Sequence, residues 1–207
     1  MKEELRFLWA FLCNPSAVSS VVPTASWNVK KICSTIPHDV RRIIVEYGPG
    51  TGVVAKHLLG ERRLTRDSML IMIERDKKLA SALAKKWKSD PRARVFQDSA
   101  ENVLDVTESC GVENVDHVIT SIPFSKIQQE IVARIMEHTH NILKPGGELT
   151  AFQVSGKVKE VLRSHDGFDD MTHERLWANL PPLILARVKK TQQDPAPDTH
   201  PSASIAL

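Results

Sequence analysis

A short apolar run that leads into three alternating glycines constrains this chain more than any other feature. Residues 43–45, Ile-Ile-Val, are typical of a buried parallel strand, and the acid Glu46 follows them directly. The next residues form a G-x-G-x-G loop whose glycines are Gly48, Gly50 and Gly52. A strand-to-helix turn needs backbone conformations that glycine adopts at low cost, and a ligand can approach glycine backbone closely. The loop is therefore predicted to bind a ligand and to lead into a helix over residues 53–60.

The main alternative is the dinucleotide-binding pattern G-x-G-x-x-G. That pattern would place its third glycine at position 53, which is Val53 in this chain. The acid Glu46 also disfavours a pyrophosphate, which prefers free amides at a helix N-terminus and positive neighbours. Glu46 instead suits a cationic ligand.

Two further acids follow apolar runs at the spacing expected for successive strands. Glu74 ends the run over residues 69–73, and Asp98 ends the run over residues 93–97. An acid at the end of the second strand is placed to accept hydrogen bonds from ribose hydroxyls. A carboxylate at the end of the third strand is placed to accept one from an exocyclic adenine amine.

The rest of the chain continues the alternation of strand and helix. Further strands are predicted over residues 115–120, 148–154, 175–180 and 183–188, and further helices over residues 25–36, 77–88, 101–109 and 126–142. Such alternation implies a parallel sheet with helices on both faces and a ligand at the carboxyl ends of its strands. The side chains predicted to converge there are Glu46, Glu74, Asp98 and Ser121.

The order of these motifs resembles the class I S-adenosylmethionine-dependent methyltransferases. The matching segments lie at 45–52, 73–76, 97–100, 120–124 and 143–147. The resemblance implies an α/β, Rossmann-like fold with seven mostly parallel strands, helices on both faces and an antiparallel last strand. It implies S-adenosyl-L-methionine as cofactor and S-adenosyl-L-homocysteine as product. The cofactor-binding residues that it implies are Glu46, Gly48, Pro49, Gly50, Gly52, Glu74, Arg75, Asp98, Ser99, Ala100 and Ser121.

The segment Ser121-Ile-Pro-Phe124 is the predicted acceptor site. It resembles the Asn-(Pro/Ile/Leu)-Pro-(Tyr/Phe) motif of amino-directed methyltransferases, with Ser121 in place of the Asn. The resemblance places Ser121, Pro123 and Phe124 at the catalytic site, where backbone carbonyls accept the hydrogens of the amine. The aromatic ring of Phe124 is itself suited to hold a cationic product by cation–π contact. The alternative for Phe124 is an ordinary core aromatic residue.

A wider similarity points to the small bacterial phosphatidylethanolamine N-methyltransferases. It includes Val21-Val-Pro-Thr24, Ile122-Pro-Phe-Ser125 and Asn179-Leu-Pro-Pro182 in addition to the cofactor loop. It implies that the acceptor is the amine of a phosphatidylethanolamine-type phospholipid on an anionic membrane surface. The ribosomal-RNA adenine dimethyltransferases resemble the first half as well, so methylation of RNA or of a small molecule stays open, with nucleic acid as the weaker alternative. A cofactor-binding module without catalysis is the third hypothesis.

Composition and charge set the cellular context. The 207 residues are 42% hydrophobic and 26% charged, as in an ordinary globular domain. Residues 1–100 contain 18 Lys and Arg against 10 Asp and Glu. This excess suits either contact with an anionic surface of phospholipid or RNA, or an ordinary solvated surface of mixed charge. The three cysteines have neither disulfide-framework nor zinc-site spacing, and no signal peptide is apparent. A cytoplasmic protein is expected, peripheral on the inner face of the membrane if its substrate is a lipid.

Three segments are predicted: residues 1–36 as N-terminal helices that cap the core or contact the membrane, 37–190 as the methyltransferase domain, and 191–207 as a disordered tail. Residues 2–13 carry a strongly apolar helical stripe. Residues 155–173 are predicted to be a solvated connector without a metal site, although they contain scattered His and Asp. Lys157, Lys159 and Arg163 in this connector are candidates for contact with an anionic headgroup.

Overall fold

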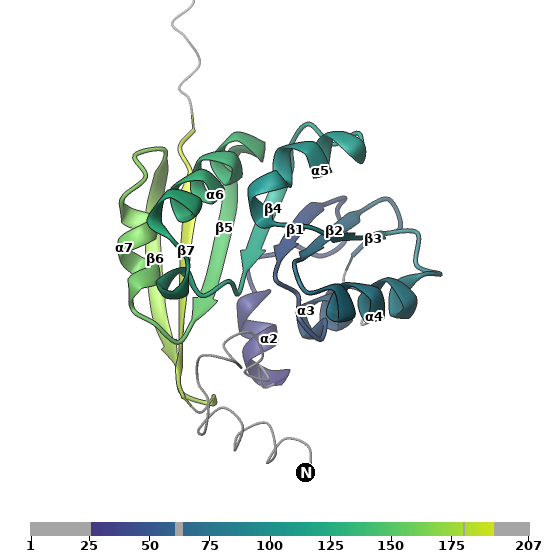
Figure 1. Ribbon diagram of the computed structural model, residues 1–207, viewed down its shortest axis with the longest axis horizontal. Coiled ribbons are helices and arrows are strands. Elements are labelled where there is room, and N and C mark those ends of the chain that lie inside the picture. The colour runs from purple at the N-terminus through teal and green to yellow at the C-terminus, as the bar shows by residue number, and fades with distance from the viewer. Residues whose placement is uncertain (1–25, 61–63, 180, 193–207) are drawn as a thin grey trace, which may run out of the picture.

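A seven-stranded sheet with helices on both faces makes up the part of the chain that the structure describes (Figure 1). The computed structural model describes residues 26–60, 64–179 and 181–192. The predicted helix over residues 2–13 and the predicted tail beyond residue 192 lie outside the described residues, as does most of the predicted segment 1–36.

The strands are ordered β3-β2-β1-β4-β5-β7-β6 across the sheet. The first five in the chain run parallel, whereas β7 is antiparallel to both β5 and β6. The predicted fold class is therefore confirmed, including an antiparallel strand near the end of the chain. The strands are β1 (Ile43–Tyr47), β2 (Met69–Glu74), β3 (Ala93–Gln97), β4 (Val115–Thr120), β5 (Leu143–Gln153), β6 (Phe168–Leu176) and β7 (Leu183–Lys190).

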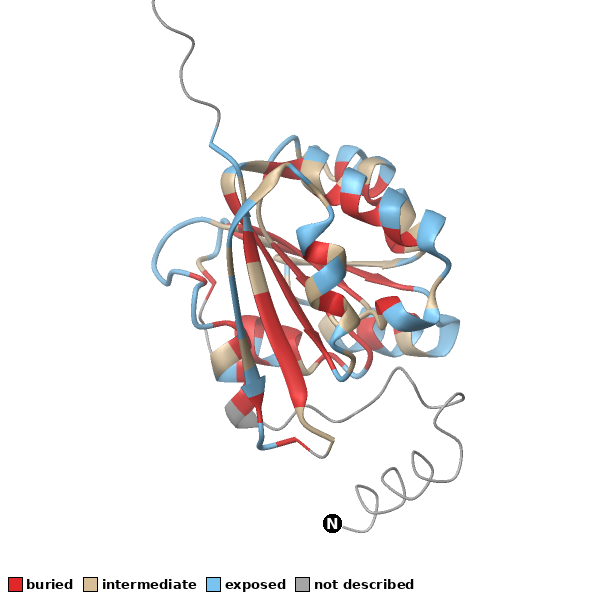
Figure 2. Ribbon diagram, turned by 90° about the vertical axis from the view of Figure 1, so that its left-hand side faces the viewer, coloured by how far each residue is buried: buried red, intermediate tan, exposed pale blue. Residues whose placement is uncertain are grey.

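Two apolar layers join the helices to the sheet. The layer on one face contains residues of α2 (Ser26–Ile32), α3 (Val53–Ala55), the π-helical turn η1 (Lys56–Gly60) and α4 (Lys77–Trp87). The layer on the other face contains residues of α5 (Val103–Ser109), α6 (Gln129–Ile142) and α7 (Lys157–Arg163). Two short 3-10 turns, η2 (Ala100–Asn102) and η3 (Phe124–Lys126), follow β3 and β4. The central strands are buried between these layers (Figure 2).

The prediction that residues 155–173 form a solvated connector is wrong. This segment contains α7 and most of β6. The helix is short, and its two buried side chains, Val158 and Leu162, are interrupted by charged residues. Most residues of β6 are exposed because this strand forms the edge of the sheet, so it lacks the alternation of apolar and polar residues that identifies a half-buried strand (Figure 2).

The strand predicted over residues 148–154 begins earlier in the structure. Strand β5 already begins at Leu143 and includes Pro145 and Gly146. Its register against β4 shifts between the pairs Val115–Leu143 and His117–Glu148, and Gly146 has a φ of 72°. The Pro-Gly sequence therefore forms an irregularity inside the strand, a place where sheets tolerate both residue types.

Candidate cofactor and acceptor site

The glycine loop is fixed against the ends of β2 and β4. The Gly48 amide donates to the Ile73 carbonyl at 2.9 Å, and the Ser121 hydroxyl donates to the Gly48 carbonyl at 2.8 Å. All three loop glycines have positive φ: 66° at Gly48, 57° at Gly50 and 73° at Gly52. Other residue types seldom adopt these values, which explains the G-x-G-x-G pattern. Pro49 lies inside this loop, and its carbonyl accepts from the Gly52 amide at 2.8 Å.

Glu74 joins the loop to the second strand. One carboxylate oxygen accepts from the Gly50 amide at 3.0 Å, and the other accepts from the Asp76 amide at 2.9 Å. A carboxylate has about four acceptor positions, so two hydrogen bonds leave capacity for ribose hydroxyls. Glu74 was predicted at the site, but its hydrogen bond to the loop was not, because that bond depends on the three-dimensional packing of the two turns.

Glu46 is a buried acid for which the described part of the chain supplies no compensating partner. Its side chain lies within β1 and is 3% exposed, and its Oε2 atom has no hydrogen-bond partner among the described residues. Burial, reinforced by the nearby negative charge of Glu74, raises the pKa of Glu46 to about 8. Buried polar groups are normally satisfied, so an orphaned carboxylate with a raised pKa beside a ligand loop indicates a functional group. A cationic ligand would favour its ionised form.

The third acid, Asp98, belongs to the turn after β3. Its amide donates to the Glu74 carbonyl at 3.1 Å, which links the ends of β2 and β3. Its Oδ1 atom accepts from the Ser99 amide and from the Asn102 side chain, both at 2.7 Å. No described donor contacts Oδ2, so this oxygen is available to an adenine amine. Ala100, also predicted at the site, is buried at the start of η2.

Two of the predicted cofactor residues, Ser99 and Arg75, differ from the others in the contacts of their side chains. The Ser99 hydroxyl caps η2 by accepting from the Glu101 amide, and it donates to the Glu101 carboxylate. Arg75 follows β2 and is exposed, and no described acid pairs with it. The hydrogen bonds described above thus connect Gly48, Gly50, Glu74, Asp98 and Ser121, whereas the Arg75 side chain is not part of that network.

The acceptor segment after β4 is held from the end of β5. The Phe124 amide donates to the Gln153 side-chain oxygen at 3.2 Å, and the Pro123 carbonyl accepts from the Lys126 amide at 2.8 Å. The Phe124 ring is 1% exposed and packs in the core, and it also forms one wall of a pocket. Gln153 is 4% exposed, and its Nε2 atom has no partner among the described residues. Gln153 was not among the predicted site residues, because its place at the end of a strand is a weak signal in the sequence.

The described part of the chain contains neither a metal site nor a membrane-spanning helix. No group of three His, Cys, Asp or Glu side chains is arranged there to hold a metal ion. Among the same residues, no helix has the length and apolar character needed to cross a bilayer.

The arrangement of strand ends, glycine loop and acids is that of a class I S-adenosylmethionine-dependent methyltransferase. The sequence matches the methyltransferase small domain family over residues 29–167, which is more than half of the chain. The chain therefore belongs to the methyltransferase small domain family, and the predicted enzyme class is confirmed.

Similar proteins act on chemically different acceptors. An ornithine lipid N-methyltransferase of Singulisphaera acidiphila is 26% identical over 183 residues, which cover 88% of this chain and 93% of that protein. The structure of an O-methyltransferase from Bacillus cereus in complex with SAH superposes with a TM-score of 0.65 and 14% identity, over 89% of this chain and 90% of that one. An rRNA methylase from Streptococcus thermophilus gives a TM-score of 0.59 and 15% identity, over 83% and 100%. The two structural similarities concern the fold alone.

The residues at the strand ends fit the cofactor of this family. S-adenosylmethionine carries a sulfonium, an ammonium, a ribose and an adenine, and it supplies an activated methyl group. The orphaned Glu46 carboxylate suits the positive charges, the remaining acceptor capacity of Glu74 suits the ribose, and the open oxygen of Asp98 suits the adenine amine. Gly48 and Gly50 carry no Cβ atom, so no side chain of their own obstructs a ligand that approaches this backbone.

Proposed function

We propose that this protein transfers the methyl group of S-adenosylmethionine to the amine of a membrane lipid. The observation that carries the proposal is the match to a lipid N-methyltransferase, which extends over nearly the whole of both chains. The motifs after β4 support it, since Ser121-Ile-Pro-Phe124 resembles the acceptor segment of amino-directed enzymes. Phosphatidylethanolamine and ornithine lipid both offer such an amine.

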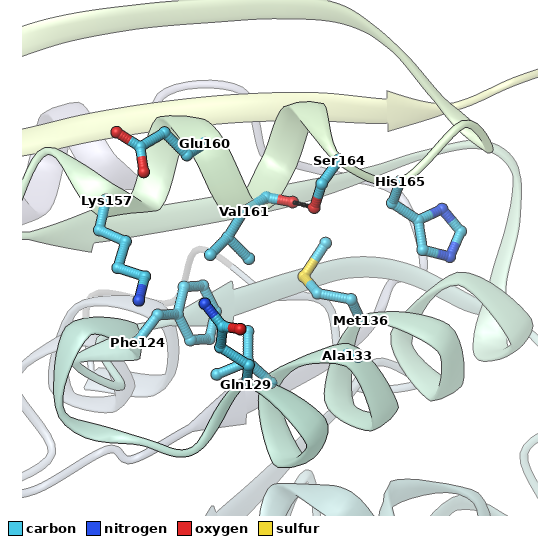
Figure 3. A pocket seen from close by; sticks show the side chains of 10 residues that line it. Phe124, Gln129, Ala133, Met136, Lys157, Glu160, Val161, Ser164 and His165 are labelled. Atoms are coloured by element: carbon cyan, nitrogen blue, oxygen red, sulfur yellow. Dashed lines mark hydrogen bonds between the residues drawn. The ribbon is translucent and has the colours of Figure 1, made fainter.

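A pocket between α6, α7 and η3 supports an amphiphilic acceptor (Figure 3). Its volume is about 390 Å³. The Phe124 ring forms one wall, and the side chain of Lys157 extends toward it from α7 (Figure 3). An apolar wall beside an ammonium group matches a lipid headgroup region, in which carbon chains adjoin an anionic phosphate or carboxylate. The other lining residues are Gln129, Val132, Ala133, Met136, Glu160, Val161, Ser164 and His165.

The chemistry requires positioning more than activation. Orienting an amine in line with the sulfonium methyl group contributes up to about 7–11 kcal/mol. An alkyl ammonium has a pKa of about 10, so the amine must lose a proton before it attacks, and burial among apolar groups favours that loss. Because the Pro123 carbonyl already accepts from Lys126, the carbonyls of Ser121 and Ile122 are the better candidates to accept the amine hydrogens. The enclosed Phe124 ring can hold a methylated cation only from the pocket side.

Labelled methyl transfer tests the proposal. The purified protein is incubated with S-adenosylmethionine carrying a radioactive methyl group, together with vesicles that contain phosphatidylethanolamine or ornithine lipid and, separately, with total RNA. We expect label in one or both aminolipids. Exchanging Lys157 for Met should lower turnover on lipid more than the same exchange at Lys85, which lies exposed on α4. Labelling of RNA with none in either lipid would overturn the proposal.

A further inference from the structure

A second, basic pocket lies on the outer side of α7, between this helix and the edge strand β6. Its volume is about 300 Å³. Three of its lining side chains are basic or can become so: Lys159 on α7, and His173 and Arg175 on β6. Glu174 and Ile184 complete the lining. The pocket is separate from the one described above, with which it shares no lining residue.

The acid in this lining does not neutralise the basic side chains. Successive residues of a strand point to opposite faces of the sheet, so His173 and Arg175 share one face and Glu174 points to the other. On that other face, Glu174 forms ion pairs with Lys31 of α2 and with Arg187 of β7. Among the described residues, no carboxylate lies within ion-pair distance of Lys159, His173 or Arg175. The pocket thus presents uncompensated positive charge to the solvent.

An exposed aromatic side chain adjoins this charge. Trp177 follows the last residue of β6 and is 72% exposed, the largest exposure of any large apolar residue in the described chain. The Arg175 guanidinium lies over its ring, 5.2 Å from the centroid. Tryptophan beside basic side chains is typical of proteins at the membrane–water interface, where the ring lies among headgroups and the cations contact phosphates.

The pocket and Trp177 lie beside the carboxyl ends of the parallel strands, as the candidate site does. Gln153 of β5 pairs with Ile184 of β7, which in turn pairs with Arg175 of β6. These residues form one row across three strands, and strands are spaced about 4.8 Å apart, so Arg175 lies roughly 10 Å from Gln153 across the row. Gln153 holds the acceptor segment through Phe124. A surface bound at Trp177 would therefore face the site of methyl transfer.

We propose that Lys159, His173, Arg175 and Trp177 form an anchoring site that binds the phosphate of an anionic phospholipid in a bilayer. The anchoring site differs from the pocket between α6, α7 and η3 that is proposed for the acceptor, and its ligand need not carry an amine. It extends the proposed function by placing the carboxyl edge of the sheet on the membrane. Each cation near an anionic bilayer strengthens binding about fivefold, so two or three suffice to orient a protein that has other contacts.

Vesicle binding without cofactor tests the anchoring site. Full-length protein is floated with vesicles of phosphatidylcholine alone or of phosphatidylcholine with phosphatidylglycerol, neither of which carries a primary amine. We expect binding only to the anionic vesicles. Reversing the charge at Arg175 and Lys159 together (R175E/K159E) should weaken binding about tenfold or more, and W177S should weaken it at both low and high salt. The matched control K85E changes an exposed lysine on α4. This helix packs on β2 and β3, on the side of the sheet away from β6.

The outcomes separate the anchoring site from the proposed function. Equal binding by R175E/K159E and K85E, or no binding of the unchanged protein to anionic vesicles, would overturn the anchoring site. Loss of RNA binding without loss of vesicle binding in R175E/K159E would overturn it as well, in favour of a nucleic-acid contact. Methylation of a detergent-dispersed aminolipid reports on the proposed function alone, and R175E/K159E should retain it.

Discussion

Exchanging Glu46 for Gln is expected to stabilise the cofactor-free protein at neutral pH and to weaken its binding of S-adenosylmethionine. Folding raises the pKa of Glu46 from 4.5 to about 8, so the folded state holds a proton that the unfolded state releases in this range. The stability that this proton provides is complete below pH 4.5 and is lost as the pH rises toward 8. At pH 7 this loss lowers the free energy of unfolding by about 3 kcal/mol. Gln does not ionise, so E46Q avoids the loss. Cofactor affinity should fall by about 1.5–3 kcal/mol, the contribution of a hydrogen bond to a charged group.

Denaturant unfolding from pH 5 to pH 9 and calorimetric titration over the same range measure the two effects. In the unchanged protein, cofactor affinity should rise toward pH 8 because binding must release the proton of Glu46. E46Q should lack that rise, while any titration of the ligand's own amine appears in both proteins and cancels. The control is Glu148, a buried glutamate that accepts from Thr150 at 2.9 Å and lies 3.7 Å from the Arg187 guanidinium. E148Q should destabilise, and a stabilised E148Q or a destabilised E46Q would contradict the assignment.

Placing a methyl group on Gly52 is expected to destabilise the protein by about 2–5 kcal/mol. The left-handed conformation at Gly52 costs a non-glycine residue about 1–2 kcal/mol. A Cβ atom there would also lie 2.6 Å from Cδ2 of Leu83, a 2% exposed side chain of α4. Overpacking of this kind adds about 1–3 kcal/mol. Because the cofactor loop and α4 would both have to shift, cofactor binding should weaken in parallel.

Gly111 provides the matched control for Gly52. Its φ of 67° is similar, but a Cβ atom would meet nothing within 4 Å, so G111A should show the backbone cost alone. Denaturant unfolding of G52A, L83A and the double variant G52A/L83A then isolates the steric contact. We expect the double variant to be less destabilised than the sum of the two single changes. Equal effects of G52A and G111A would show that Leu83 does not constrain the loop.

The elements that surround the cofactor site could be predicted because each leaves a strong local pattern. Buried parallel strands are continuous apolar runs, and β1 to β4 were found where the runs indicated. Their polar ends follow directly, since parallel strands with aligned registers end at one edge of the sheet. The glycine spacing likewise reflects the positive φ at Gly48, Gly50 and Gly52.

The features that escaped prediction depend on contacts between distant segments. The hydrogen bonds of Gly50 with Glu74 and of Phe124 with Gln153 join residues that are 24 and 29 positions apart. That no described residue partners the Glu46 carboxylate is equally invisible in a sequence. At the other end of the chain, β6 is an edge strand whose exposed residues resemble a connector. The basic pocket there arises only because β6 lies beside α7.

A crystal structure with S-adenosyl-L-homocysteine bound tests most directly whether the carboxyl ends of β1 to β4 hold the cofactor. We expect its ribose hydroxyls within hydrogen-bond distance of Glu74, its adenine amine beside Asp98, and its sulfur facing Ser121. Electron density for the ligand in the pocket between α6 and α7, or at the amino ends of the strands, would contradict the assignment.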